Sequence, residues 1–384
     1  MGTSPEEIDT PKQGSDRILL ISVIMLMIFG ILAVYSSIAY FAESRGTTAG
    51  LLVTDHIVKL GIAFLVILIM SKINYRIVAR FSRIAVVFSW LLLIAVMIYG
   101  DLVFGARRSL SLGAFSFQPA SFAAVALIIH IAVLLFEKQE YIKDFKRSFL
   151  PVMIWVTITC GLIAIEDFSS AALLMGASLL LMFIGRISSM HILGLILIGL
   201  LGATAFVSGS AERQSRVTQY ISQITEINNS EFEPGAGYQA QQAHIAIARG
   251  EFIGVGIGKS TQRDFLPAPY NDFIFAIITE EYGIAGAGAV ILAFVVILFR
   301  GIAVIARNAE DNLGTLLATG CTLLIALYGF VNAAVATGLF PVTGLPMPFV
   351  SYGGTSMLFT GLMIGMLLNI SKHNLKSKRN FYNS

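Results

Sequence analysis

A single acidic residue, Asp272, stands where the longest polar stretch of the sequence runs into an apolar one. The stretch from 261 to 281 is TQRDFLPAPYNDFIFAIITEE. Pro267 and Pro269 stiffen the approach because each fixes φ and removes a hydrogen-bond donor, and Asn271 is predicted to cap a helix that begins at Asp272. A carboxylate is thus predicted where a water-facing loop enters a membrane helix, and ionisable groups at such places are often functional. A capping role alone is the open alternative, since the helix dipole also favours an acid there.

Further acids lie near Asp272 and in one other junction. The same helix continues with Glu280 and Glu281, and ionisable groups in such apolar sequence are rare and usually functional or paired. Glu280 lies two turns below Asp272 and about 80° around the helix, so both are predicted to line one cavity. The alternative is that Glu280 or Glu281 pairs with an arginine or caps another helix. Asp167, which follows Glu166, is predicted to cap the next apolar helix.

The residues just before this junction offer polar and cationic groups. Residues 237–251 are predicted to form a short helix on which Gln239, Gln242 and Arg249 share one side. Alternating glycines at 254, 256 and 258 then precede Lys259, a pattern in which backbone N–H groups and a cation can approach an anion. A solvated helix face and a flexible turn are the alternatives. No His, Cys and carboxylate cluster has metal-ligand spacing, so no protein metal site is predicted.

Membrane-spanning helices must position these residues. Of the 384 residues, 56% are hydrophobic and only 13% are charged, which is typical of a multispanning membrane protein. The net charge of +3 is too small to indicate nucleic-acid binding. Since a span needs roughly 20 apolar residues, the sequence predicts an all-α integral membrane protein with ten spans. They are 17–41, 54–71, 84–100, 119–136, 150–165, 168–185, 190–208, 272–299, 312–337 and 354–371.

The basic residues predict the orientation of these spans. Lys and Arg gather in the loops after the second, fourth, sixth and eighth spans and in the last residues. Because such loops face the cytoplasm, both termini are predicted to be cytoplasmic and the loop 209–271 between the seventh and eighth spans to be extracytoplasmic. Residues 1–16 are expected to be a disordered tail, 17–371 one membrane domain and 372–384 a basic tail.

Two segments depart from this simple pattern. Arg107 and Arg108 lie in a short outer loop against the charge bias, where they can meet a substrate anion or a lipid phosphate. The segment 338–354, GLFPVTGLPMPFVSYGG, is rich in Pro and Gly and is predicted to be non-helical. Such backbone is tolerated at membrane depth only when it is packed in protein or lines a wet cavity. Its Ser351 and Tyr352 are predicted to bind a ligand or to satisfy this backbone.

Several motifs together resemble those of the SEDS family (shape, elongation, division and sporulation), which contains FtsW, RodA and SpoVE. The resemblance extends over all ten predicted spans. The motifs are VYSS at 34–37, GARR at 105–108, SFQP at 116–119, YQ at 238–239 with Gln242, ARGEFIGVGIGKS at 248–260, FLP with DFIFAIITEEYG between 265 and 283, and TGLFPVTGLPMPFVSYGGTS at 337–356.

The resemblance implies a peptidoglycan glycosyltransferase of the bacterial cytoplasmic membrane. Such an enzyme polymerises lipid II, an undecaprenyl diphosphate-linked disaccharide peptide, outside the membrane with inversion to a β-1,4 bond. Its implied partners are a class B penicillin-binding protein and, in the FtsW branch that this chain resembles most, other divisome proteins and membrane lipid. Asp272 matches the acid that the family requires and would be the base.

The resemblance also assigns the remaining site residues. Arg107, Arg108 and Lys259 are expected to stabilise the departing diphosphate, and a divalent cation, Mg²⁺ or Mn²⁺, could share this task. The expected substrate-binding residues also include Gln118, Gln239, Gln242, Arg249, Ser351 and Tyr352.

One departure from the family pattern concerns charge inside the membrane. After SFQP the family usually has Ser-Glu-Leu-Ala-Lys, whereas this chain has Ala-Ser-Phe-Ala-Ala, so Ser121 and Ala124 replace an acid and a base. Losing both together leaves no unpaired charge. The alternatives are a lipid II flippase or other transporter, a weakly active scaffold that recruits the penicillin-binding protein, and a RodA-like role in elongation. A transporter would place its key charges near the membrane midplane.

Overall fold

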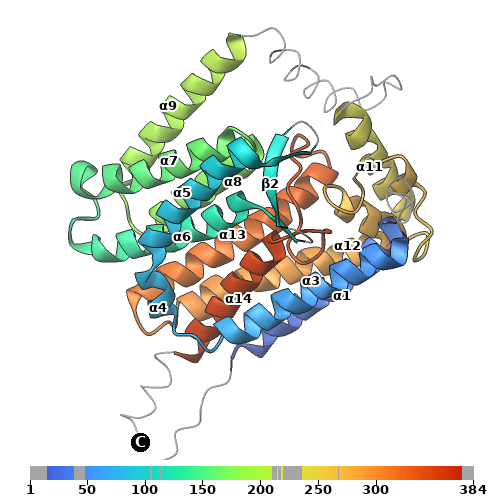
Figure 1. Ribbon diagram of the computed structural model, residues 1–384, viewed down its shortest axis with the longest axis horizontal. Coiled ribbons are helices and arrows are strands. Elements are labelled where there is room, and N and C mark those ends of the chain that lie inside the picture. The colour runs from blue at the N-terminus through green and yellow to red at the C-terminus, as the bar shows by residue number, and fades with distance from the viewer. Residues whose placement is uncertain are drawn as a thin grey trace, which may run out of the picture.

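The computed structural model describes residues 15–38, 48–103, 106–112, 115–209, 214, 218, 236–266 and 268–373. Most of them are helical (Figure 1). The two predicted tails fall almost wholly outside these ranges. The helices are α1 (Arg17–Ser37), α3 (Ala49–Met70), α4 (Tyr75–Arg80), α5 (Ser82–Tyr99), α6 (Pro119–Glu137), α7 (Leu150–Ala164), α8 (Phe168–Ile184), α9 (Ser189–Ser208), α11 (Ala236–Gly250), α12 (Ile274–Phe299), α13 (Asn312–Ala336) and α14 (Ser356–Lys372).

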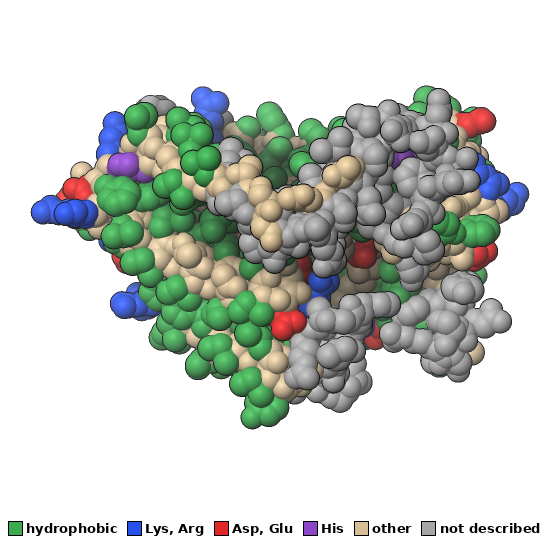
Figure 2. All heavy atoms as spheres, turned by 90° about the horizontal axis from the view of Figure 1, so that it is seen from above, with side chains coloured by type: hydrophobic (Ala, Val, Ile, Leu, Met, Phe, Trp, Pro, Cys, Tyr) green, Lys and Arg blue, Asp and Glu red, His purple; other side chains and the backbone are tan. Residues whose placement is uncertain are grey.

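Each of the ten predicted spans overlaps one of these helices. Within the described residues, seven helical stretches are long and apolar enough to cross a bilayer: α1, α3, α5, α6, α12, α13 and the stretch that ends with α7. Three further apolar segments, in α8, α9 and α14, are shorter. Figure 2 shows hydrophobic side chains over much of the described surface, with Lys and Arg gathered near the two ends of the molecule. The chain is therefore a largely helical membrane protein, and the number of ten spans stays a prediction.

Three short strands were not expected from the sequence. Strands β1 (Asp101–Val103), β2 (Ala106–Leu112) and β3 (Phe115–Phe117) pair in the order β1-β2-β3. Both pairings are antiparallel, with Leu102 opposite Arg107 and Leu110 opposite Phe117. The all-α prediction was therefore wrong for 101–117. Short alternating runs such as SLSL favour strands, but they were treated as part of a loop between spans.

Helices α6 and α13 form the centre of the molecule. Two thirds of the most apolar window of each is buried, against 28% for α3 and α5. Small residues allow close packing at the edge, where α14 lies against α3. A Cβ on Gly361 would come within 2.8 Å of the Ala63 carbonyl oxygen, and one on Gly365 within 2.5 Å of the Met70 Cβ. This packing fixes the helices that surround the site described below.

Helix α12 is broken at Gly283, whose φ of 67° and ψ of −168° are not helical. Two contacts with α13 show the effect. The rings of Phe294 and Phe330 lie 6.3 Å apart, while Asn332 donates from Nδ2 to the carbonyl oxygen of Asp272 over 3.1 Å. A straight helix running from Asp272 to Phe294 would hold these two residues about 33 Å apart. The break therefore turns the first half of α12 back towards α13 and brings Asp272 into the helical bundle.

Candidate active site

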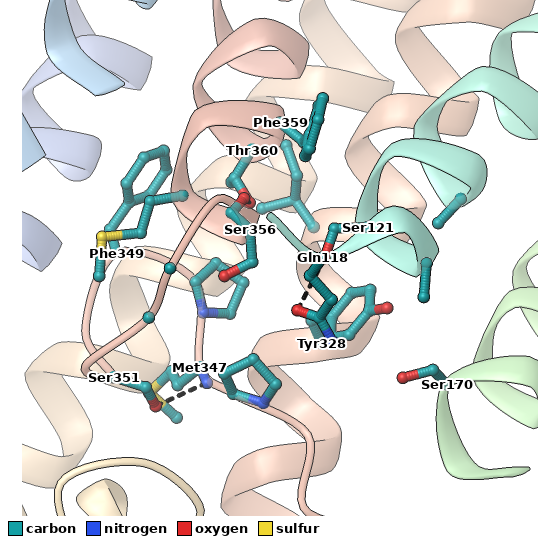
Figure 3. Close-up of a pocket in the computed structure, with 18 of the residues that line it drawn as sticks. Gln118, Ser121, Ser170, Tyr328, Met347, Phe349, Ser351, Ser356, Phe359 and Thr360 are labelled. Carbon is teal, nitrogen blue, oxygen red and sulfur yellow. Dashed lines mark hydrogen bonds between the residues drawn. The ribbon is translucent and has the colours of Figure 1, made fainter. Parts of the chain in front are cut away.

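A cavity of about 240 Å³ lies among α6, α8, α13, α14 and the non-helical segment between α13 and α14. In Figure 3, Gln118 and Ser121 come from the start of α6, Ser170 from α8 and Tyr328 from α13. Hydroxyl groups and the side-chain amides of Gln118 and Asn271 thus share the wall with apolar side chains. The other wall residues labelled in the figure are Met347, Phe349, Ser351, Ser356, Phe359 and Thr360.

The predicted non-helical segment forms one side of this cavity, as expected for irregular backbone at membrane depth. Ser351 satisfies part of that backbone. Its Oγ accepts from the Met347 N–H over 2.8 Å and donates to the Asn271 carbonyl oxygen over 2.7 Å. Phe349 is fully buried with φ at 62°. The segment is thereby fastened to the turn that carries Asp272.

Asp272 lies in a turn before α12 and does not begin the helix. The N–H groups of Asn271 and Asp272 both donate to the carbonyl oxygen of Ala268, over 3.2 and 3.3 Å. Helix α12 starts at Ile274 and has no side-chain N-cap. The prediction that Asn271 caps this helix was therefore wrong. Its Nδ2 instead donates to the Asp272 carboxylate over 2.7 Å.

Burial and nearby charges set the acidity of Asp272. Burial raises the pKa of this carboxyl from 3.8 to about 6; Arg108 pulls it down, and Asp167 pushes it up. A Cβ on Gly344 would lie 3.7 Å from Asp272 Oδ2 and 4.0 Å from Arg108 Nη1. The Asp272 carboxylate and the Arg108 guanidinium therefore both lie next to this glycine. Gly344, Asn271 and Arg108 belong to the cavity wall, although the Asp272 carboxylate does not. The acid therefore stands directly beside the charged end of the cavity.

Arg108 and Asp167 are the charged residues of the wall in the part of the chain that the structure describes. Arg108 donates from Nε to the Glu166 carbonyl oxygen over 3.1 Å, which holds the strand end near α8. The capping role predicted for Asp167 is confirmed, since it accepts from the N–H and the hydroxyl of Ser170 over 3.1 and 2.8 Å. Both charges therefore belong to residues just outside the spans.

The rest of the wall is uncharged. Ser121 and Ala124, the positions at which the resemblance leads one to expect Glu and Lys, both face the cavity. The Ser121 hydroxyl donates to Gln118 Oε1 over 3.1 Å. Because no charge lies here, this part of the cavity suits an uncharged ligand group.

Asp55 and Lys59 lie in a predicted span and were not singled out from the sequence, but they are linked to the cavity wall through Tyr352. The Tyr352 hydroxyl donates to Asp55 Oδ2 over 2.6 Å, and Lys59 forms an ion pair with the same carboxylate. The Tyr352 ring faces the cavity and meets that of Tyr270 edge-on at 5.7 Å. The signal was an acid and a base four residues apart in apolar sequence, where ionisable groups are rare.

Other predicted site residues lie away from the cavity. Gln239 and Gln242 are half-buried on α11, Arg249 is an exposed residue near the end of that helix, and Lys259 is exposed in the following loop. None of these four lines the cavity. Arg107 belongs to β2, but its side chain is outside the described part.

The prediction that Glu280 shares a cavity with Asp272 was wrong. Glu280 is fully buried and accepts from the N–H groups of Thr261 and Gln262 over 3.1 and 3.3 Å. The alternative, that Glu280 pairs with an arginine, is confirmed, because Arg249 Nη1 lies 3.6 Å from Glu280 Oε1. The loop that follows α11 folds over this carboxylate, which separates it from Asp272. The N–H groups expected to meet an anion are partly used as well, since that of Gly256 donates to the Glu281 carbonyl oxygen.

Comparison with known proteins gives this arrangement a family. A model of cell cycle proteins of the FtsW, RodA and SpoVE type matches residues 16–376. The chain belongs to this family. The chain is 34% identical over 369 residues to the stage V sporulation protein E of Bacillus subtilis. The match covers 95% of this chain and 99% of that protein. The chain is also 34% identical to the probable peptidoglycan glycosyltransferase FtsW of Trichlorobacter lovleyi, with 93% of each covered.

Solved structures show the same fold for this FtsW/RodA/SpoVE chain. A structure described as a peptidoglycan synthase complex that coordinates polymerization and crosslinking matches with a TM-score of 0.76 and 22% identity, covering 96% of this chain and 99% of the other. The crystal structure of Thermus thermophilus RodA matches with a TM-score of 0.67 and 21% identity, over 94% and 97%. The family predicted from the motifs is confirmed, and the names of its relatives support the predicted glycosyltransferase class.

Proposed function

We propose that the chain polymerises lipid II into glycan strands and releases undecaprenyl diphosphate. The observation that carries this proposal is the pair formed by Asp272 and Arg108 at one end of a cavity with hydroxyl-bearing walls. A base beside a cation suits a transfer in which one oxygen loses a proton while another gains negative charge.

Asp272 is the general base of the proposed reaction. Its carboxylate takes the proton of the acceptor 4-hydroxyl while that oxygen bonds to the anomeric carbon of the donor sugar. The anomeric carbon–oxygen bond to diphosphate breaks on the opposite face, which inverts the configuration, and the diphosphate keeps the electron pair. A pKa near 6 leaves Asp272 ionised at neutral pH yet more basic than a solvated aspartate. Arg108 lies where it can stabilise the negative charge of the diphosphate.

A divalent cation, Mg²⁺ or Mn²⁺, would depend on the substrate more than on the protein. Among the described residues, no three His, Cys, Asp or Glu side chains gather to hold a metal ion. Asp167 already accepts two hydrogen bonds from Ser170. Mg²⁺ commonly keeps several waters and binds substrate phosphates, so the diphosphate would be its main ligand and Asp272 would stay free to accept the proton. Bound there, the ion would offset the charge of the leaving group.

The proposed setting is septal cell-wall synthesis in the cytoplasmic membrane, with both termini in the cytoplasm and the Asp272 side outside. Similarity to FtsW proteins supports the division role. The fold shared with a peptidoglycan synthase complex supports a class B penicillin-binding protein as partner. The charged end of the cavity includes Asp167, which precedes α8 and lies outside its apolar run, and this favours a polymerase over a transporter.

The test is glycan synthesis by purified protein given labelled lipid II, with and without a class B penicillin-binding protein. Asp272→Ala is expected to remove glycan chains. Asp264→Ala, at an exposed acid in the preceding loop, is the matched control and should leave them unchanged. Chains made equally well by Asp272→Ala would refute Asp272 as the base. Absence of chains from every sample, with the partner present, would favour a scaffold.

A further inference from the structure

The break in α12 leaves backbone groups that a regular helix would have paired. Residues 251–257, here called the capping loop, provide the missing partners. The N–H groups of Val255 and Gly256 donate to the carbonyl oxygens of Glu280 and Glu281 over 2.9 and 3.1 Å. On the other side of the break, the Ile284 N–H donates to the Glu251 carbonyl oxygen over 3.0 Å. Because unpaired backbone is costly away from water, the capping loop completes the helix.

Glycines hold the capping loop against α12 at backbone distance. A Cβ on Gly254 would come within 2.2 Å of the Glu281 carbonyl oxygen, and one on Gly283 within 2.3 Å of the Phe252 carbonyl oxygen. Both residues have positive φ, at 93° and 67°, which also favours glycine. The loop therefore has one fixed position beside the break.

In this fixed position the capping loop turns large apolar side chains outward. Phe252, Ile253 and Ile257 are 70%, 80% and 60% exposed. Contact with lipid instead of water is favourable for each of these side chains. The loop lies directly beside Ile284, which is 59% exposed on the membrane-spanning part of α12. The apolar surface of the loop thus continues the lipid-facing surface of a span.

Helix α1 gives the depth of this surface in the bilayer. Its 21 residues span about 31 Å, close to the thickness of the hydrocarbon core. Ser36, at the end of α1, donates to the buried carboxylate of Glu281, and its carbonyl oxygen accepts from Arg263 Nη1 over 2.8 Å. The break and the capping loop therefore lie at the boundary between hydrocarbon and headgroups. The exposed Lys259 follows the loop at this level, where headgroup phosphates favour a basic residue.

We propose that the capping loop is a lipid-binding surface, with Phe252, Ile253 and Ile257 inserted among the acyl chains of the leaflet at the Ser37 end of α1. This surface is independent of the proposed reaction. It fastens the connection between α11 and Asp272 to the bilayer, because that connection runs through the capping loop. The Arg249–Glu280 ion pair joins α11 to the same place.

Site-directed spin labelling of the whole chain in lipid nanodiscs tests the proposal. Cys160 and Cys321 are buried and would be replaced by alanine. A nitroxide is then attached at Ile253→Cys, with Ile284→Cys as the lipid-facing control and Lys143→Cys, in an exposed loop, as the water-facing control. Collision with oxygen, which concentrates in lipid, is compared with collision with a water-soluble nickel complex. We expect the oxygen-to-nickel ratio at 253 to match that at 284 and to exceed that at 143 several-fold.

A ratio at 253 equal to that at 143 would overturn the proposal, because the loop would then face water. Loss of both collisions at 253 when a penicillin-binding protein is added, from a water-like starting value, would show a protein-docking surface and would also overturn it. Labelling at Ile257→Cys repeats the measurement at a second position. Only samples that remain monodisperse on gel filtration are compared, so that a misfolded variant cannot mimic water exposure.

Discussion

Replacing Asp272 with asparagine is expected to stabilise the fold while removing glycan synthesis. In the folded chain burial raises the pKa of Asp272 to about 6, against 3.8 for a solvated aspartate. The folded state therefore holds this proton more tightly than the unfolded state, and ionising it at neutral pH lowers stability. The two pKa values differ by about 2, and each unit corresponds to about 1.4 kcal/mol. The cost is thus about 3 kcal/mol at most, and about 1–3 kcal/mol after allowance for partial exposure.

Asp272→Asn removes this cost and keeps an oxygen that can accept from Asn271 Nδ2. Its melting temperature at pH 7.5 should rise by a few degrees. Fluorescence of the stacked Trp90 and Trp155 can follow the unfolding. The wild-type penalty is full above the folded pKa, shrinks as the pH falls from about 6 to 3.8 and is absent below that range, so the gain should vanish near pH 4. Asp264→Asn, at a more exposed acid, is the control and should change neither stability nor activity. A lower melting temperature at pH 7.5, an equal gain at pH 4, or retained glycan synthesis would refute the reasoning.

Three further predictions concern the charged end of the cavity and the broken helix. Arg108→Gln should slow polymerisation at least tenfold. It should also raise the pKa of Asp272, because Arg108 pulls that pKa down, so the acid limb of the pH–rate profile should move to higher pH. An unmoved acid limb would contradict the electrostatic coupling of Arg108 and Asp272. Gly283→Ala should destabilise by several kcal/mol, since its Cβ would meet the capping loop backbone at 2.3 Å. Gly288→Ala, with nothing within 4 Å, should be nearly neutral, and equal melting temperatures for the two would argue against the packed break. Glu280→Gln should loosen the loop at 258–263, because a neutral amide holds Arg249 and the loop N–H groups less strongly than a carboxylate does. The measurement is amide hydrogen exchange, which should become faster in this loop. Unchanged exchange would show that Glu280 does not anchor the loop.

Hydrophobic pattern alone located most helices of this chain. The predicted helix at 237–251 is α11, and the Pro- and Gly-rich segment at 338–354 is non-helical and faces a cavity. The cap at Asp167 was also predicted correctly. These features are local: a helix needs a continuous apolar run, and a cap needs one side chain a few residues away. Neighbouring residues in the sequence therefore carry the whole signal.

The sequence by itself thus determined the membrane class of the protein, the approximate helix positions, the family and the choice of Asp272 as the acid to examine. Tertiary structure decided what that acid meets. The break at Gly283 brings Asp272 back to α13, pairs Glu280 with the loop after α11 and places Arg108 across Gly344 from the carboxylate. Each of these contacts joins residues that lie far apart in the chain or on the two sides of a kink. Their formation depends on how whole helices pack, which no local pattern of residue types specifies.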